Sequence, residues 1–294
     1  MQELIKKADV LIEAMPYIQK FRNKVIVVKA GGSAMENKEH LQGMLEDVTF
    51  MECVGMLPVL VHGGGKSISR KMQEAGIQSK FLNGFRVTCE KSIKVVEQVI
   101  KEDVNYDIVK RLTELGATAK TLPGELVFKV EKKVERDERT GELLDWGFVG
   151  EPVSVDTDLI MPLIAAGIIP VIYPLGTGPD GKIYNINADT AAAAVAKALK
   201  VWKLAFLTDV PGLMRNPEDP ETIITTIKAS QISELKDKGI IKGGMLPKVE
   251  SMLEALDAGV KKIHIIDGRM PHSLLLEIFT DKGVGTEILR NEQD

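Results

Sequence analysis

The residues of this sequence that could carry chemistry are lysines, one aspartate and a series of glycine-rich turns. Two of these turns, "KAGGS" at 29–33 and "HGGGK" at 62–66, each follow an apolar run typical of a strand and precede a helical pattern. Their backbone N–H groups can point at an anion near a helix N-terminus, and glycine leaves the anion room to approach. One such turn is explained by tight strand-to-helix geometry alone. Two in succession, the first opening with Lys29, favour a phosphate cradle.

The stretch "LVHGGGKS" ends in Gly-Lys-Ser, as an ATP-binding P-loop does, but it lacks the rest of that pattern. A P-loop needs a glycine five residues before its last glycine, and Leu60 stands there. A dinucleotide fingerprint on Gly63 and Gly65 needs a third glycine or alanine where Ile68 stands. The turn therefore belongs to another architecture.

The second half of the chain adds an acidic and a basic candidate. In "NINADTAAAAVAKAL", Asn185, Asn187 and Asp189 open an alanine-rich helix, and one of Asn187 or Asp189 would cap it. Capping alone does not require all three polar residues. In "KGGMLPKVESMLEAL", Lys248 lies in the first helical turn, where a cation opposes the helix dipole. Lys248 is therefore either solvated or placed there for an anion, and we favour the anion.

Lysines, backbone amides and one aspartate suit phosphoryl transfer, in which positioning and charge neutralisation supply most of the catalysis. Hydrolase and zinc chemistry lack support, because the sequence contains no Gly-x-Ser-x-Gly elbow, no His-Glu-x-x-His motif and no Cys/His cluster. His62 precedes the second glycine turn, but a lone histidine at a strand end is more typical of a structural hydrogen-bonding residue than of a general base.

The composition is that of an ordinary globular protein. The 294 residues carry a net charge of −4 and their lysines alternate with acids, which argues against a nucleic-acid partner. No run reaches membrane-spanning length and the N-terminus lacks an apolar signal core, so we expect a cytoplasmic enzyme or binding protein with no membrane partner. Cys53 and Cys89 have no metal-ligand spacing, and we expect them to be buried apolar residues rather than a disulfide.

Apolar runs typical of strands alternate with helical patterns almost from end to end. This alternation predicts an α/β fold with a mostly parallel sheet covered by helices on both faces. The clearest strands are expected at 25–29, 58–62, 168–173, 203–208 and 261–266. Because ligands bind beyond the carboxyl ends of the strands in such sheets, the tails of these strands should form the site at one edge.

Three segments depart from the alternation. Residues 125–151 contain two period-two runs around "RDERTGE", and "PLGTGPDGKIYNIN" is punctuated by Gly and Pro, so each is expected to form a hairpin. We place the boundary between an N-terminal lobe (22–178) and a C-terminal lobe (179–294) near Gly178. Residues 1–21 form an added helix that packs either on its own domain or on another subunit, through an apolar stripe of Leu4, Ile5, Ala8, Leu11, Ile12 and Met15.

Seven motifs in order along the chain carry a resemblance: "VVKAGGSAM", "VLVHGGG", "NGFRVT", "GFVGEP", "NINADTAAAAVA", "LTDVPG" and "GGMLPKV". Together they resemble the amino acid kinase family, in the branch that phosphorylates N-acetyl-L-glutamate. The resemblance implies an open three-layer αβα sandwich whose N-terminal lobe binds the amino acid and whose C-terminal lobe binds ATP with Mg2+. It also implies the second step of arginine biosynthesis, which forms N-acetyl-L-glutamyl 5-phosphate.

By this resemblance the site residues fall into three groups. The catalytic group is Lys29, Lys248 and the orienting Asp189. The amino-acid group is Gly63, Gly64, Gly65, Arg86 on the α-carboxylate, Asn185 and Asn187, and which asparagine touches the substrate stays open. The nucleotide group is Gly31, Gly32, Thr208, Asp209, Val210, Pro211, Gly212, Gly244 and Met245, with Mg2+ carried by ATP rather than by protein ligands.

Two details of the resemblance concern the chemistry. The acceptor carboxylate of glutamate, with a reference pKa of about 4.3, is ionised at neutral pH, which explains why no convincing base appears in the sequence. Lys66, where relatives often have proline, is a departure, and we do not give it the role of a P-loop lysine.

The ends of the chain resemble the arginine-inhibited members of that branch, which form hexamers, as trimers of dimers, through interlaced N-terminal helices. The resemblance rests on the first helix and on "HSLLLEIFTDKGVGTEI". It implies an arginine effector site bordered by His272, Glu277, Gly283, Gly285 and Thr286, and it leaves binding of a PII-type regulator open. Taken alone, "SLLLEIF" is typical of an ordinary amphipathic last helix.

Two alternatives remain open at this point. Within the family, a kinase for a carrier-linked aminoadipate or glutamate in lysine biosynthesis differs in pocket shape, which the sequence does not measure. From another class, a non-catalytic amino-acid sensor would use the same fold, although the presence of Lys29, Lys248 and Asp189 argues against it.

Overall fold

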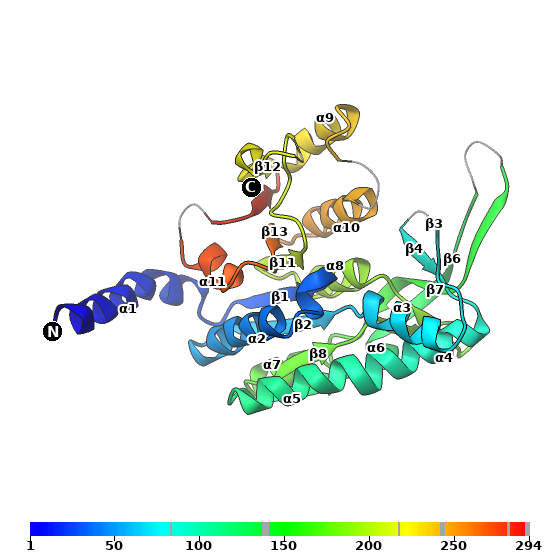
Figure 1. The fold of residues 1–294 in the computed structure, drawn as a ribbon, viewed down its shortest axis with the longest axis horizontal. Coiled ribbons are helices and arrows are strands. Elements are labelled where there is room, and N and C mark those ends of the chain that lie inside the picture. The colour runs from blue at the N-terminus through cyan, green and yellow to red at the C-terminus, as the bar shows by residue number, and fades with distance from the viewer. Residues whose placement is uncertain (83, 137–140, 217, 242–244, 281–282, 292–294) are drawn as a thin grey trace.

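The computed structural model describes residues 1–294 except 83, 137–140, 217, 242–244, 281–282 and 292–294. Its centre is an eight-stranded sheet in the order β12-β14-β13-β11-β1-β2-β8-β5 (Figure 1). The five strands expected from the sequence are present to within one residue at each end. In chain order the sheet comprises β1 (Val25–Ala30), β2 (Leu57–His62), β5 (Ala119–Leu122), β8 (Ile169–Ile172), β11 (Lys203–Thr208), β12 (Thr226–Lys228), β13 (Lys262–Asp267) and β14 (Thr286–Leu289).

The described strands of this sheet pair in parallel, apart from β13 with β14. The carboxyl ends of β1, β2 and β11 therefore meet at one edge, as the sequence predicts. The strands β5, β12 and β14 were not expected from the sequence. These strands of three or four residues lie at or next to the sheet edges, and they are too short for a readable period-two pattern.

Helices cover both faces of the sheet, which confirms the layered α/β fold (Figure 1). Successive strand residues point to opposite faces, so Val27 and Phe206 join one apolar cluster while Val28 and Leu60 join the other. One face is covered by α2 (Lys38–Cys53), α5 (Tyr106–Glu114) and α11 (Ser273–Ile278). The other is covered by α7 (Met161–Ala165), α8 (Ala188–Leu199), α9 (Ile232–Asp237) and α10 (Met245–Asp257).

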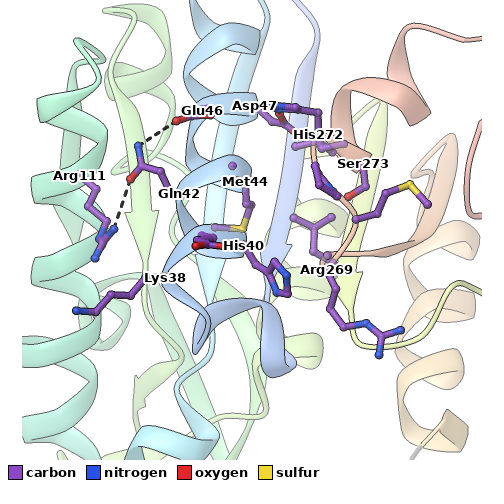
Figure 2. A pocket seen from close by; sticks show the side chains of 17 residues that line it. Lys38, His40, Gln42, Met44, Glu46, Asp47, Arg111, Arg269, His272 and Ser273 are labelled. Carbon is purple, nitrogen blue, oxygen red and sulfur yellow. Dashed lines mark hydrogen bonds and ion pairs between the residues drawn. The ribbon is translucent and has the colours of Figure 1, made fainter.

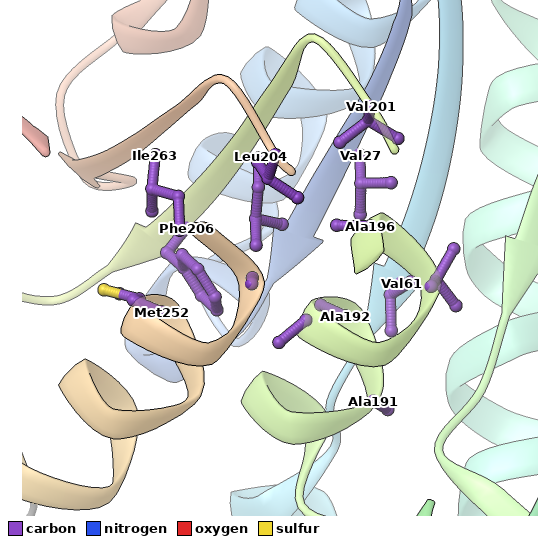
Figure 3. Packing of buried hydrophobic residues seen from close by; sticks show 14 of the residues in the cluster. Val27, Val61, Ala191, Ala192, Ala196, Val201, Leu204, Phe206, Met252 and Ile263 are labelled. Carbon is purple, nitrogen blue, oxygen red and sulfur yellow. The ribbon is translucent and has the colours of Figure 1, made fainter. Parts of the chain in front are cut away.

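Alanines let α8 lie close against the sheet (Figure 3). Ala191, Ala192 and Ala196 are buried in one cluster with Val27 and Val61, and small side chains allow the helix backbone to approach the strands. The first turn of α8 is thereby brought to the carboxyl end of β1, which α8 contacts directly.

A small barrel and a two-stranded ribbon stand beside the main sheet. The barrel is formed by β6 (Phe128–Arg136), β7 (Leu143–Val155), β9 (Leu175–Thr177) and β10 (Ile183–Asn185), and the ribbon by β3 (Lys80–Leu82) and β4 (Phe85–Val87). The antiparallel pairs β6–β7 and β9–β10 confirm both expected hairpins. Position 178 lies in the turn between β9 and β10, so the chain leaves the barrel after β10; the division into lobes stays a prediction.

The remaining described elements lie between or beside the strands in the chain order. They are α1 (Gln2–Phe21), α3 (Gly65–Glu74), α4 (Glu90–Gln98), α6 (Gly124–Val127), the π-helical η2 (Val99–Asn105) and the 3-10 turns η1 (Gly32–Met35), η3 (Pro220–Thr222) and η4 (Ala229–Gln231).

The N-terminal helix α1 extends away from the body of the molecule (Figure 1). Phe21 at its end is buried in the core, whereas the expected apolar stripe is in solvent, with Leu4 64%, Leu11 67% and Ile12 63% exposed. The stripe therefore does not pack on its own domain. Among the described helices, none is both long enough and apolar enough to cross a membrane.

The expectation that both cysteines are buried is wrong. Cys53 is the last residue of α2 and Cys89 is the N-cap of α4, and both side chains are exposed and free. Each stands at a helix end, outside the buried face of its helix, and the apolar residues near each cysteine in the sequence do not reveal this position.

Gly124, at the start of α6, has no room for a side chain. A Cβ there would lie 2.0 Å from the carbonyl oxygen of Tyr173 and 2.4 Å from that of Leu175. Because backbone atoms would have to move, we expect Gly124→Ala to lower the free energy of unfolding by about 3 kcal/mol, measured by urea denaturation.

Gly43→Ala is the matched control, because a Cβ at Gly43 in α2 meets nothing within 4 Å. It should leave stability unchanged or raise it by up to about 1 kcal/mol through helix propensity. Equal stability of the two variants would contradict the packing described around Gly124.

Candidate active site

Lys29, Asp189 and Lys248 form one charged cluster at the carboxyl ends of the strands. Lys29 lies near the end of β1, Asp189 in the first turn of α8 and Lys248 in the first turn of α10. Lys29 Nζ is 2.9 Å from Asp189 Oδ1, and Lys248 Nζ is 3.2 Å from Asp189 Oδ2. Each oxygen of one carboxylate thus holds one lysine, and the structure brings the three predicted catalytic residues together.

The charges in this cluster do not cancel. Burial would raise the pKa of Asp189, but the positive charges of Lys29 and Lys248 outweigh burial and lower its pKa to about 2. The carboxylate is therefore ionised throughout the neutral range, where it balances one of two ammonium groups. Lys248 is not a solvated surface residue, since 16% of its side chain is exposed. The net positive charge in a partly enclosed position attracts an anion.

The first glycine turn is shaped around the Lys29 ammonium. A Cβ on Gly31 would lie 1.8 Å from Lys29 Nζ, so glycine at this position leaves room for the lysine as well as for a ligand. Gly32 has a φ of +67°, in the left-handed region that glycine adopts without strain.

The second glycine turn is tied to the first. The Gly63 N–H donates to the carbonyl oxygen of Ala30 at 2.9 Å, and Gly64 is the N-cap of α3. The first N–H groups of a helix have no partner inside the helix, so the start of α3 can bind an anion.

A cavity of about 140 Å³ gathers the whole predicted amino-acid group beside this second turn. The apolar wall of the cavity was not expected from the sequence, although "KFLNGFRV", with its central glycine, is a hairpin pattern that could have placed Phe81 and Phe85 next to Arg86. The lining comprises Gly63, Gly64, Gly65, Arg86, Asn185 and Asn187, with Ile68, Phe81, Phe85, Ile100 and Val149 among the apolar residues.

Arg86 is a buried cation with neutral partners. Its Nη1 donates to Ser79 Oγ at 2.7 Å, and its Nη2 donates to the Gly65 carbonyl oxygen at 2.6 Å and to Ser69 Oγ at 2.8 Å. The residue is 7% exposed and burial lowers its pKa, yet in the described part of the chain no carboxylate contacts it. A buried guanidinium without a counter-ion is costly, so this site is suited to an anionic ligand.

The two asparagines have different free groups. Asn187 is the cap of α8, because its Oδ1 accepts from the N–H groups of Asp189 at 2.8 Å and Thr190 at 3.3 Å. This leaves the Asp189 carboxylate for the lysines and the Asn187 amide nitrogen for a ligand. The side chain of Asn185 has no hydrogen-bond partner among the described residues, so both asparagines can present amide donors to the cavity.

A second cavity, of about 260 Å³, connects this region to the first glycine turn. It shares Gly64, Gly65 and Arg86 with the smaller cavity and extends to Gly32. At its rim Lys66 Nζ lies 3.2 Å from Glu36 Oε2, with 60% and 38% of the two side chains exposed. Such an exposed pair contributes little to stability, and Lys66 does not reach the Lys29 cluster.

His62 is a structural residue, as the sequence analysis favoured. It is fully buried, with Nδ1 2.8 Å from the Gly63 carbonyl oxygen and Nε2 2.9 Å from Asn105 Nδ2. Burial lowers its pKa to about 4, against a smaller opposite effect of the Gly63 hydrogen bond. The ring is therefore neutral near pH 7, and both of its nitrogens are engaged within the protein.

The predicted nucleotide group follows the end of β11 and the start of α10. Thr208 Oγ1 accepts from the Val210 N–H at 3.1 Å. Asp209 lies beside the first glycine turn, since a Cβ on Gly32 would be 3.5 Å from Asp209 Cγ. Pro211 and Gly212 continue this segment and Met245 opens α10, whereas Gly244 lies outside the described residues.

Two of the predicted effector residues, Glu277 and Gly283, line a cavity of about 210 Å³ at the end of α1, together with Tyr17 and Lys20. Glu277 Oε1 is 2.5 Å from His264 Nδ1, and Oε2 accepts from the N–H of Val284 at 2.7 Å and of Gly285 at 3.0 Å. Glu277 thus holds the backbone that follows Gly283 against α11.

The other three predicted effector residues lie elsewhere. His272 lines a separate cavity of about 500 Å³, where its Nδ1 is 2.7 Å from Asp47 Oδ1 of α2 (Figure 2). Gly285 is buried against the backbone of β13, because a Cβ there would lie 2.1 Å from the Ile265 carbonyl oxygen. Thr286 is buried too, and its Oγ1 accepts from the Leu213 N–H at 2.8 Å. These residues support the surrounding fold and do not line the cavity at α1.

The chain belongs to the amino acid kinase family, whose sequence profile matches residues 24–267. Within this family, relatives named acetylglutamate kinase share 42–48% identity with the chain over nearly its full length. The acetylglutamate kinase of Caldanaerobacter subterraneus subsp. tengcongensis is 48% identical over 286 residues, which cover 97% of this chain and 93% of the relative. The resemblance found in the sequence and the sandwich fold that it implies are confirmed.

Solved structures agree with this placement. N-acetylglutamate synthase from Neisseria gonorrhoeae complexed with coenzyme A and N-acetyl-glutamate matches with a TM-score of 0.83 and 26% identity. The match covers 97% of this chain and 64% of the synthase, less than two thirds of that protein. The synthase complexed with coenzyme A and L-arginine matches with a TM-score of 0.80 and 25% identity, covering 96% of this chain and 65% of the synthase.

Gly31→Ala should reduce turnover without unfolding the protein. The added Cβ meets the Lys29 ammonium, the free end of a flexible side chain, so the lysine is displaced and the backbone is not. We expect kcat for phosphoryl transfer from ATP to fall on the order of 100-fold, as when one preorganised charge is lost, with an unchanged urea midpoint. Gly43→Ala again serves as the control. Wild-type turnover of the Gly31 variant would contradict the role of the turn.

Proposed function

We propose that this chain transfers the γ-phosphoryl group of ATP to the side-chain carboxylate of N-acetyl-L-glutamate, in the cytoplasm, as the second step of arginine biosynthesis. The single observation that carries the choice of acceptor is Arg86, a buried guanidinium with neutral partners that faces the same cavity as two amide side chains. An acylated amino acid offers a carboxylate to the guanidinium and an amide to the asparagines.

In this proposal the α-carboxylate lies on Arg86, with Asn185 and Asn187 near the acetylamino group. The side-chain carboxylate then reaches the glycine turns, where Gly64 and Gly65 line both cavities. A glutamate carboxylate is ionised at neutral pH, so its oxygen can attack the γ-phosphorus without a base. The bond from that phosphorus to the bridging oxygen breaks, and ADP leaves with the electron pair.

The proposed role of the lysine cluster is to offset the repulsion between two anions. Asp189 fixes both ammonium groups, so Lys29 can meet the transferring phosphoryl group while Lys248 meets the nucleotide side. The glycine cradle at 31–32 and the net positive charge fit the phosphates of ATP. Mg2+ bound to ATP would neutralise further phosphate charge.

The assay that tests this function is ADP release with ATP and Mg2+ across N-acetyl-L-glutamate, glutamate, aspartate, carbamate and N-acetyl-aminoadipate. We expect turnover with N-acetyl-L-glutamate and little with the others. Efficient turnover of the longer acceptor would favour the lysine-pathway alternative. ATP binding without turnover of any acceptor would favour a sensor.

The variant Arg86→Lys tests the proposed orientation of the acceptor in the same assay. A lysine cannot contact Ser79, Ser69 and the Gly65 carbonyl oxygen at once as the planar guanidinium does, so its charge is not held at the same point. We therefore expect KM for N-acetyl-L-glutamate to rise on the order of 10- to 100-fold, with KM for ATP unchanged. An equal rise in both KM values would contradict the assignment of Arg86 to the amino acid.

The proposal extends to regulation by arginine at the cavity under α1. Glu277 and Glu287 can face a guanidinium, while Lys20, Lys203 and Lys262 can face a carboxylate. Burial lowers the pKa of Lys203 to about 8, against the raising effect of the two glutamates, so it keeps most of its charge near pH 7. The synthase structure with L-arginine, which shares this fold, supports the choice of ligand. Binding of a PII-type regulator stays a prediction.

The exposed stripe of α1 supports a homo-oligomer, because a row of large apolar side chains in solvent is costly unless another copy covers it. We propose a hexamer in which these helices pair. A chain lacking residues 1–20 should then sediment as a smaller species, keep turnover and lose inhibition by arginine.

The variant Glu277→Gln separates inhibition by arginine from hexamer formation, since the truncation changes both. It should keep the hexamer and raise the arginine concentration for half-inhibition on the order of 10-fold or more, because one charge-assisted contact is lost. A truncated chain that stays hexameric and arginine-sensitive would contradict this part of the proposal.

A further inference from the structure

A buried polar network behind the 63–65 turn contains groups that touch neither proposed substrate. Asn105 is 1% exposed and is the last residue of η2, a π-helical segment between α4 and α5. Its side chain lies among His62 at the end of β2, the carbonyl oxygen of Val171 in β8, and Thr121 in β5. π-helical turns are rare and are frequently found at functional sites, which makes this asparagine a candidate for a functional role.

The neighbours of Asn105 assign the direction of its amide. Nδ2 lies 3.3 Å from the Val171 carbonyl oxygen, which can only accept, and 2.9 Å from His62 Nε2. Oδ1 is in close contact with Thr121 Oγ1, which donates to it. Turning the amide over would set two oxygens against each other at Val171. Nδ2 is therefore the donor to His62.

This donor in turn fixes the tautomer of His62. Because Nε2 accepts from Asn105, it carries no proton, and the proton of the neutral ring is on Nδ1. Nδ1 lies 2.8 Å from the Gly63 carbonyl oxygen and donates to it. The chain of hydrogen bonds therefore runs from Thr121 through Asn105 and His62 to the backbone of the glycine turn.

The end of this chain sets the direction of one peptide group. In a trans peptide the C=O and the following N–H point in opposite directions. Since the Gly63 C=O is turned into the protein toward His62, the Gly64 N–H is turned outward, toward the cavity that Gly63, Gly64 and Gly65 line. In the described part of the chain this N–H has no acceptor, so it is available to an anion.

We infer that Asn105 is a positioning residue, which fixes His62 as its Nδ1–H tautomer and thereby aims the Gly64 N–H at the reacting anion. The inference deepens the proposed function and rests on it for the identity of that anion. It assigns a role to the π-helical segment, which carries Asn105, and to His62, which precedes the glycines. The His62 ring does not need to change its protonation during turnover.

The substitution Asn105→Asp tests the inference with almost no change of shape. A carboxylate can only accept, so Nε2 of His62 should take up the proton, and in a ring that burial keeps neutral this leaves Nδ1 bare against the Gly63 carbonyl. The Gly64 N–H then loses its direction, and we expect kcat to fall on the order of 10- to 100-fold with KM for ATP unchanged. The tautomer is read from the 15N shifts of the His62 ring in histidine-labelled protein.

Thr121→Val is the matched control, because it removes one hydrogen bond from the same amide and leaves the Asn105 donor in place. It should keep the Nδ1–H tautomer and a kcat close to that of the wild type. A comparable loss of kcat in both variants would mean that the network only stabilises the fold, and would overturn the inference.

The tautomer of His62 and kcat together give the other possible outcomes of the Asn105→Asp experiment. Loss of the Nδ1 proton in the Asp variant together with the fall in kcat supports the inference. A fall in kcat with the Nδ1 proton retained overturns it, as does unchanged kcat in either protonation state. An Nε2–H tautomer in the wild-type protein overturns it as well, and that measurement requires no variant to fold. Absence of turnover in the wild type would instead count against the proposed function, while the ring shifts would still test the network.

Discussion

One carboxylate between two lysines is the contact on which the site depends. Asp189 can hold Lys29 and Lys248 only if β1, α8 and α10 converge at one edge of the sheet. The parallel order of β11, β1 and β2 supplies that edge, and the alanines of α8 let the helix lie close enough for its first turn to reach the strand. The small side chains under α8 are thus needed for the ion pair between Asp189, in the first turn of the helix, and Lys29 of β1.

The proposed active site and the proposed regulatory site lie at opposite ends of the strands of the main sheet. Lys29 shares a face of β1 with Val27, toward α8 and α10, near the carboxyl end of the strand. The cavity at α1 involves Lys203 and Lys262, the first residues of β11 and β13, at the opposite end of the sheet. The strands β11 and β13 connect the two sites, because each runs from the cavity at α1 to the edge where Thr208 lies.

Much of this could be read from the sequence, because the signals are local. Apolar runs placed five strands, glycine turns marked the ligand-binding edge, and the polar residues of "NINAD" placed a helix start. The features that the sequence does not indicate depend on distant partners. Nothing near His272 in the sequence indicates that it meets Asp47 of α2, and the exposure of Cys53 follows from where α2 ends. The role of Asn105 is hidden for the same reason, since its partners come from three strands.

The cations of the proposed site are held in place in two different ways. The Arg86 guanidinium donates to three neutral acceptors, so its direction is fixed before any ligand arrives, whereas among the described residues Lys29 and Lys248 are each paired with Asp189 alone. In the proposed pose, the amino acid therefore meets the Arg86 cation at one end and backbone N–H groups of the 63–65 turn at the other. The distance between Arg86 and the 63–65 turn then limits how long the acceptor amino acid can be in this pose. In the proposed pose, a side chain longer by one methylene has to bend toward Phe81 and Ile100 of the cavity wall to place its carboxylate at the same point, so the proposal attributes discrimination to two fixed ends rather than to pocket volume.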